Sequence, residues 1–210
     1  FSGCTDVSQG SAPATAPVPQ QKGKPMPIDP ARTVTLGGGC FWCLEAFYER
    51  IEGIEDVESG YSGGRVPNPT YQQVSGEGTG HAEVVQLKFD PAKISYREIL
   101  EIFFTMHDPT TLNRQGADEG TQYRSIILHH TPQQKTDAEA LIKDLTDQQL
   151  FGGNKIVTQV VPFEAFYVAE ISHQDYYEQN PNAGYCRVVI DPKVKKLQQK
   201  FSHRLKAKYR

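Results

Sequence analysis

The residues best suited to chemistry are two cysteines in the segment Gly39-Cys40-Phe41-Trp42-Cys43. A strand-like stretch precedes them and apolar residues at helical spacing follow, so Cys40 is predicted at a helix N-terminus. Free backbone N–H groups and the helix dipole favour a thiolate there, which makes Cys40 a candidate nucleophile. Cys43 lies one helical turn away, within reach of a disulfide with Cys40. The alternative is that both are small buried apolar residues.

The second candidate is a carboxyl group in a strand. Glu83 interrupts the apolar run of Gly80-His81-Ala82-Glu83-Val84-Val85. If Glu83 is buried, desolvation favours its neutral form, which can donate a proton near neutral pH. An outward-facing residue without function is the alternative. Three further polar candidates lie in turns or loops, where turn formation or solvent exposure also explains them: Tyr71, Asp118 and Tyr123.

Several kinds of site are excluded. Zinc sites usually need two ligand pairs, but the chain has one Cys-x-x-Cys pair and its six histidines show no ligand spacing. No Gly-Lys-Ser/Thr follows the three glycines before Cys40, which excludes a phosphate-binding loop. The formal net charge of -3 argues against nucleic acid as a partner. We therefore expect no metal and no organic cofactor.

The positioning elements alternate between strands and helices. Apolar residues at i, i+3, i+4 and i+7 predict amphipathic helices over residues 44–51, 99–106 and 138–145, and a basic last helix follows. Strands are predicted over 33–36, 57–61, 82–89, 123–129, 157–161 and 187–190. This pattern predicts an α+β fold, a two-layer sandwich with a mixed β-sheet, flanking helices and a ferredoxin-like core.

The first 31 residues differ in composition from the rest. Six of the 14 prolines lie there, with few large apolar residues, which predicts a disordered linker before a folded domain over 32–210. Small residues before Cys4 resemble the end of a bacterial lipoprotein signal. Two alternatives stay open: a lipid on Cys4, which would be the only membrane contact and would place the protein in the cell envelope or periplasm, or an incidental Cys4 in a cytoplasmic protein.

Five motifs, in the same order, resemble those of the A class of peptide methionine sulfoxide reductases, and the similarity runs from about Thr33 to Lys195. They are Gly39-Cys40-Phe41-Trp42, Gly80-His81-Ala82-Glu83, Gly120-Thr121-Gln122-Tyr123-Arg124-Ser125, His173-Gln174-Asp175-Tyr176-Tyr177 and Gly184-Tyr185-Cys186.

The resemblance implies reduction of methionine S-sulfoxide, free or within proteins, to methionine. Cys40 matches the family's nucleophile and Glu83 its acid. Two aromatic residues match the walls around the substrate methyl group: Phe41 and Trp42. Three residues match the polar network at the sulfoxide oxygen: Tyr71, Tyr123 and Asp118.

The resemblance also implies how the nucleophile is regenerated. Attack leaves a sulfenic acid on Cys40, which condenses with a second thiol to a disulfide. Cys186 matches the resolving cysteine, and Cys43 is the other candidate. Thioredoxin or a similar dithiol protein would then reduce the disulfide, and we expect the enzyme to act as a monomer. Two other classes stay open: a general thiol-disulfide oxidoreductase that uses only Cys40 and Cys43, and a lipid-anchored binding protein with inert cysteines.

Overall fold

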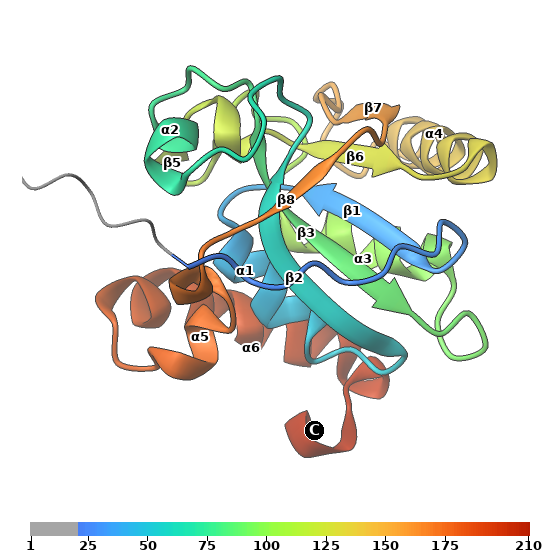
Figure 1. Ribbon diagram of the computed structural model, residues 1–210. Coiled ribbons are helices and arrows are strands. Elements are labelled where there is room, and N and C mark those ends of the chain that lie inside the picture. Colours follow the sequence, from blue (N-terminus) through green and yellow to red (C-terminus); the bar gives the residue numbers. More distant parts are fainter. Residues whose placement is uncertain (1–20) are drawn as a thin grey trace, which may run out of the picture.

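Within the described residues, 21–210 of the computed structural model, six strands form one sheet in the order β7-β6-β1-β3-β2-β8 (Figure 1). Neighbouring strands are antiparallel except β6 and β7, which are parallel, so the sheet is mixed. The strands are β1 (Thr33–Gly37), β2 (Ile54–Ser62), β3 (Ala82–Phe89), β6 (Ile126–His129), β7 (Gln159–Pro162) and β8 (Phe166–Val168).

Three helices cover one face of this sheet: α1 (Phe41–Tyr48), α3 (Tyr96–Met106) and α6 (Asp191–Phe201) (Figure 1). α1 packs on β2 and β3, and α6 packs on both α1 and α3. α4 (Pro132–Asp147) packs on α3 and beside β6 and β7. The chain order β1-α1-β2-β3-α3-β6 with the sheet order β6-β1-β3-β2 is a ferredoxin-like core, which confirms the predicted α+β fold.

Shorter elements fill the connections between these strands and helices. They are α2 (Tyr71–Ser75), the two-stranded ribbon of β4 (Arg114–Gln115) and β5 (Asp118–Glu119), the 3₁₀ helix Thr121–Tyr123, the 3₁₀ helix Ile171–His173 and α5 (Tyr176–Gln179).

Alternation along β3 decides which side chains reach the helices. Val85 and Leu87 belong to the main core under the helices, whereas Val84 belongs to a second cluster with Ile126. Successive side chains of a strand point to opposite faces. Glu83 therefore shares the helix-covered face with Val85 and Leu87.

The predicted helices and most predicted strands are present, but residues 187–190 do not form a strand. They belong to a π-helical turn, Cys186–Ile190, that runs directly into α6. Cys186, Ile190, Val194 and Leu197 are buried, at helical spacing. The β-branched residues suggested a strand, yet burial of this single stripe against the core favours the helix. In the same way, Tyr123 lies in a 3₁₀ helix before β6 rather than in that strand.

The chain is in contact with the domain before the expected boundary at residue 32. The backbone N–H of Gly23 donates to the carbonyl of Ala169, and Met26 is buried with its N–H bound to Glu58. Residues 22–26 thus contact β2 and the segment that follows β8 rather than lying apart from the domain. Cys4 and most of the expected linker lie outside the described residues. No helix between residues 21 and 210 has the length and apolar character needed to cross a membrane.

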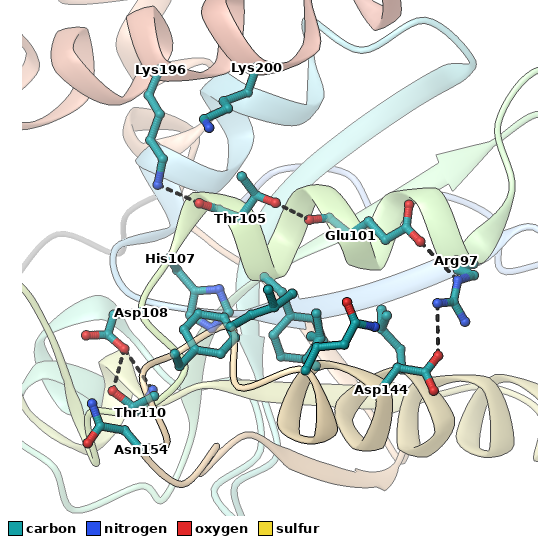
Figure 2. A pocket seen from close by; sticks show the side chains of 16 residues that line it. Arg97, Glu101, Thr105, His107, Asp108, Thr110, Asp144, Asn154, Lys196 and Lys200 are labelled. Carbon is teal, nitrogen blue, oxygen red and sulfur yellow. Dashed lines mark hydrogen bonds and ion pairs between the residues drawn. The ribbon is translucent and has the colours of Figure 1, made fainter.

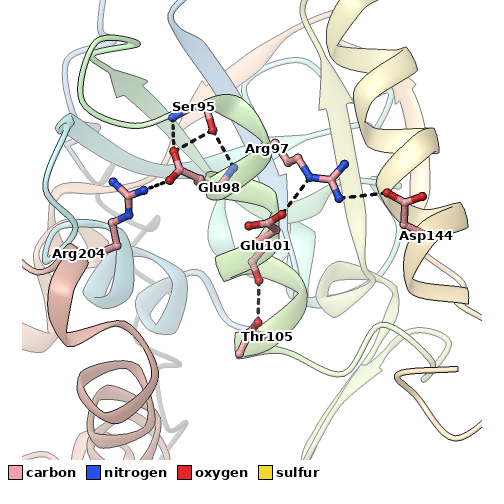
Figure 3. Close-up of polar contacts among 7 residues, drawn as sticks. All are labelled: Ser95, Arg97, Glu98, Glu101, Thr105, Asp144 and Arg204. Atoms are coloured by element: carbon pink, nitrogen blue, oxygen red, sulfur yellow. Dashed lines mark hydrogen bonds and ion pairs between the residues drawn. The ribbon is translucent and has the colours of Figure 1, made fainter. Parts of the chain in front are cut away.

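Polar contacts at the N-terminal turn of α3 fix its place in the helical layer (Figure 3). Ser95 caps its N-terminus: the Ser95 hydroxyl accepts from the N–H of Glu98, and the Glu98 carboxylate accepts from the N–H of Ser95. Arg204 pairs with the same carboxylate, which ties α3 to the C-terminal segment. Arg97 bridges to Asp144 on α4 at 3.0 Å.

We expect Ser95→Ala to lower the free energy of unfolding by about 1 kcal/mol, because the capping box then leaves a helix N–H without its partner. Urea unfolding measures this change. Thr105→Ala on the same helix removes a hydroxyl that bonds only to the carbonyl of Glu101, so it serves as the control. An equal loss of unfolding free energy in both variants would show that the capping hydrogen bonds do not specifically stabilise α3.

Candidate active site

Cys40 stands at the junction of β1 and α1 and occupies the N-cap of the helix. It is 6% exposed. Gly39 before it has φ +97, and its N–H donates to the carbonyl of Tyr123 at 3.1 Å. A Cβ at Gly39 would lie 2.6 Å from the side chain of Gln115, so only glycine fits this turn. The tight turn thus directs the thiol into the domain.

Glu83 on β3 is bound directly to the start of α1. Its Oε2 accepts the backbone N–H of Phe41 at 3.1 Å, which pairs a helix N–H that has no partner within the helix. The side chain is 1% exposed. Burial raises the pKa of this carboxyl to about 8, although the Phe41 N–H opposes the shift. Glu83 therefore carries a proton at neutral pH.

The Cys40 thiol differs from the expectation drawn from its helix position. Burial raises its pKa well above the ordinary range, and the nearby Cys43 thiol and Glu83 carboxyl raise it further. The helix N-terminus favours a thiolate, but desolvation outweighs that effect in a site this closed. Cys40 is thus a thiol rather than a thiolate in this closed site.

Cys43 lies in a more polar environment than Cys40. The Lys193 ammonium donates to its sulfur at 3.5 Å, and the Tyr185 hydroxyl lies 4.0 Å from the same atom. The hydrogen bond from Cys40 and the Lys193 charge lower the pKa of Cys43 to about 7, against the effect of burial. Tyr185 in turn donates to Asp118 on β5 at 2.8 Å.

Two tyrosine hydroxyls face the thiol and the acid. They belong to Tyr71 and Tyr123, and burial raises the pKa of both, with the Glu83 carboxyl adding to the shift. Both therefore keep their protons and are hydrogen-bond donors. Glu170 holds Tyr71 in place by accepting its backbone N–H at 3.0 Å, and it accepts the Tyr61 hydroxyl at 2.8 Å.

Aromatic side chains line the region beside Cys40. Trp42 is stacked on Tyr176 with ring centroids 3.6 Å apart, and His173 lies 5.6 Å from the Trp42 ring. Phe41 is fully buried, 5.8 Å from Tyr61 between ring centroids. Trp42 is partly exposed to solvent, whereas Phe41 is packed in the core.

Cys186 is fully buried at the beginning of the π-helical turn. It belongs to the same apolar cluster as Cys40 and Cys43, and all three cysteines are free thiols. Burial raises the pKa of Cys186. Gly184 and Tyr185 just before it are helical as well, so Cys186 is held within continuous helical structure.

The structure gathers the candidates that sequence patterns singled out into one region at the start of α1. It also adds four residues that sequence reasoning gave no role: Tyr185, Lys193, His173 and Tyr176. Three of these stand inside the quoted motifs, which was the available signal. Lys193 had none, because it is one of many lysines on a helix that sequence alone describes as solvent-facing.

A separate cavity of about 720 Å³ lies between α3, α4 and α6 (Figure 2). Its lining combines apolar residues such as Phe104 and Leu141 with charged side chains, and it includes no cysteine. It is therefore not the site of the thiol chemistry. His107 lines this cavity and also lies against Gly38, so it separates the two regions. Across residues 21–210, no three His, Cys, Asp or Glu side chains are grouped to hold a metal ion.

Comparisons with known proteins agree with this geometry. The family model described as peptide methionine sulfoxide reductase matches residues 32–205. Peptide methionine sulfoxide reductase MsrA of Sulfolobus acidocaldarius is 60% identical over 167 residues, covering 80% of this chain and 93% of the relative. The MsrA of Saccharolobus solfataricus is 58% identical over 172 residues, covering 82% and 96%. Mxr1 from Saccharomyces cerevisiae in reduced form superposes with a TM-score of 0.68 at 37% identity, covering 76% of this chain and 92% of that one. The chain belongs to the peptide methionine sulfoxide reductase family, in its A class.

Proposed function

We propose that the site around Cys40 reduces methionine S-sulfoxide, free or within proteins, to methionine and so repairs oxidative damage. The pairing of a buried thiol with a buried, protonated carboxyl carries this proposal. Glu83 is attached to the residue after Cys40 by the Phe41 N–H, so the acid and the nucleophile keep a common position. Membership of the family supports the same reaction.

The chemistry needs an acid on the oxygen side of the substrate and a nucleophile on the sulfur side. A sulfoxide sulfur becomes electrophilic when its oxygen is protonated or strongly hydrogen-bonded. Glu83 supplies the proton, and the hydroxyls of Tyr71 and Tyr123 donate to the oxygen. Asp118 fixes the edge of this network through Tyr185.

Attack by the Cys40 sulfur then transfers the oxygen. The sulfur–oxygen bond of the substrate breaks and a new one forms on Cys40. The oxygen of the resulting sulfenic acid keeps the proton given by Glu83, and the thiol proton returns to the Glu83 carboxylate. The Cys40 sulfur is oxidised as the substrate sulfur is reduced to the thioether of methionine. Trp42 and Phe41 provide the apolar surface for the substrate methyl group.

A second thiol must regenerate Cys40. We assign the completion of the intramolecular disulfide to Cys186, which shares the apolar cluster of Cys40 and Cys43. Thioredoxin or a similar dithiol protein is the proposed reductant. The burial of Cys186 means that the π-helical turn over Cys186–Ile190 has to open for this exchange. Turns of this kind recur at functional sites because they are easily rearranged.

The place of action follows from Cys4, for which the two alternatives remain predictions. With a lipid on Cys4, the domain would repair proteins of the cell envelope or periplasm. Without one, it would act in the cytoplasm. In either place we propose that the domain acts as a monomer.

Cys40→Ser is expected to abolish methionine formation, and Glu83→Gln to slow it by about 100-fold, because the amide cannot give up a proton. Turnover of methionine sulfoxide with dithiothreitol measures both. The wild-type rate should also fall as pH rises through about 8, where Glu83 loses its proton. The Glu83→Gln variant should show no such fall in rate. A general thiol-disulfide oxidoreductase would instead be indifferent to Glu83.

Trp42→Ala is expected to raise KM by about tenfold while kcat changes little, since apolar contact is lost but the acid and the thiol remain. Steady-state kinetics with methionine sulfoxide separate the two constants. An unchanged KM would contradict a role of Trp42 in substrate binding.

Cys186→Ser is expected to form methionine normally in a single turnover but to lose most thioredoxin-supported cycling. The first step needs only Cys40 and Glu83, whereas regeneration needs the second thiol. Methionine released per enzyme, with and without thioredoxin, measures this. Normal cycling by the variant would remove Cys186 from the mechanism.

A further inference from the structure

One positively charged side chain contacts a thiol of the site. It belongs to none of the sequence motifs, and the proposed reaction gives it no role. Lys193, in the first turn of α6, is partly buried and donates to the Cys43 sulfur at 3.5 Å. Among residues 21–210 it makes no ion pair with a carboxylate. A lysine in this position has a thiol sulfur as its polar partner in place of the usual carboxylate.

The other charged and titratable groups that face Cys43 come from three elements. Cys40 lies on the same helix, the Glu83 carboxyl faces it from β3, and Tyr185 and Cys186 face it from the C-terminal helical segment. Each of these is neutral when protonated, so none supplies a positive charge. His107 lies behind Lys193 and is neutral as well, because burial lowers its pKa to about 4. Lys193 is thus the positive charge available to a Cys43 thiolate.

We propose that Lys193 is a positioning residue that holds Cys43 as a thiolate, so that Cys43 rather than Cys186 makes the first attack on the Cys40 sulfenic acid. This inference rests on the proposed function, which supplies that sulfenic acid. Cys43 stands one helical turn from Cys40, and its backbone N–H donates to the Cys40 carbonyl at 3.1 Å. Among residues 21–210, no Lys or Arg side chain is hydrogen-bonded to the Cys186 sulfur, which is buried at the beginning of the π-helical turn.

The step is balanced without any further reagent. The Cys43 thiolate attacks the sulfur of the Cys40 sulfenic acid, a sulfur–sulfur bond forms, and the sulfur–oxygen bond breaks. Hydroxide leaves and takes a proton from solvent to become water. The sulfenic sulfur is reduced as Cys43 is oxidised. Cys186 can then exchange with the Cys40–Cys43 disulfide before an external dithiol reduces it.

The experiment follows disulfide formation after one turnover, with the full chain and no reductant. Reduced protein is mixed with one equivalent of methionine sulfoxide at a series of pH values around 7, quenched, alkylated and mapped by mass spectrometry. Wild type should form a Cys40–Cys43 bond first, with a rate that rises through about pH 7. In Lys193→Met the midpoint should move up by about one pH unit or more, and the rate at pH 7 should fall about tenfold. Lys193→Arg should restore most of the wild-type profile.

Lys196→Met is the matched control. Lys196 lies one turn further along α6 and donates to the carbonyl of Thr105 at 2.6 Å, away from the thiols (Figure 2). It should leave the profile unchanged. Alkylation of Cys43 in the resting protein, followed against pH in the same variants, gives a second measurement that needs no substrate.

Three results would overturn the inference. The first is an initial disulfide between Cys40 and Cys186, and the second is a Lys193→Met profile that coincides with the wild-type profile. The third is a slow rate in both Lys193→Met and Lys193→Arg with an unshifted midpoint, which would show a structural role. Failure of the wild type to form methionine at all would instead refute the proposed function, so the two failures are distinct.

Discussion

The hydrogen bond from the Phe41 N–H to the Glu83 carboxyl is the contact on which the site depends. It joins the first residue of α1 to the strand at the middle of the sheet. A helix N-terminus leaves backbone N–H groups without partners, and a carboxyl group from a neighbouring strand satisfies one of them here. The same contact sets an acid beside the residue that precedes Phe41, which is Cys40. This one hydrogen bond therefore both caps α1 and brings Glu83 close to Cys40.

The ferredoxin-like core makes this contact possible because of its strand order. β1 ends at the nucleophile and is paired with β3, which carries the acid on the face that α1 covers. Segments distant in the chain complete the site: α2 brings one tyrosine, the 3₁₀ helix before β6 brings the other, and the C-terminal segments bring the aromatic wall and Cys186. The helical layer holds these pieces together through α3, whose first turn is tied to both α4 and the C-terminal segment (Figure 3).

The surroundings of Cys40 and Cys43 shift the pKa values of the two thiols in opposite directions. The closed environment keeps Cys40 and Glu83 protonated, so the proton needed by the sulfoxide oxygen is stored in the site before substrate binds. Cys43, one turn along the helix, has Lys193 beside it and a pKa of about 7. In the proposed mechanism, low polarity around Cys40 and the Lys193 charge beside Cys43 separate attack on the substrate from regeneration of the enzyme.

The sequence alone determined the elements and most of the residues that matter. Helical spacing identified α1, α3 and α4, the apolar runs identified β1 and β3, and five motifs identified the family. It also indicated that a buried Glu83 would be an acid, because desolvation acts on any carboxyl in an apolar strand. These inferences depend on local pattern, which a linear chain displays directly.

Only the tertiary structure decided matters that depend on packing between distant segments. Residues 187–190 are rich in β-branched side chains, yet they are helical because one stripe of that helix is buried against α1 and α3. The pKa of Cys40 is raised rather than lowered because the surrounding layers exclude water, which no feature of its own helix reveals. Lys193 was one lysine among many until the fold brought its ammonium to the Cys43 sulfur. Charge and burial at a sulfur are sums over neighbours in space, and only the folded chain specifies those neighbours.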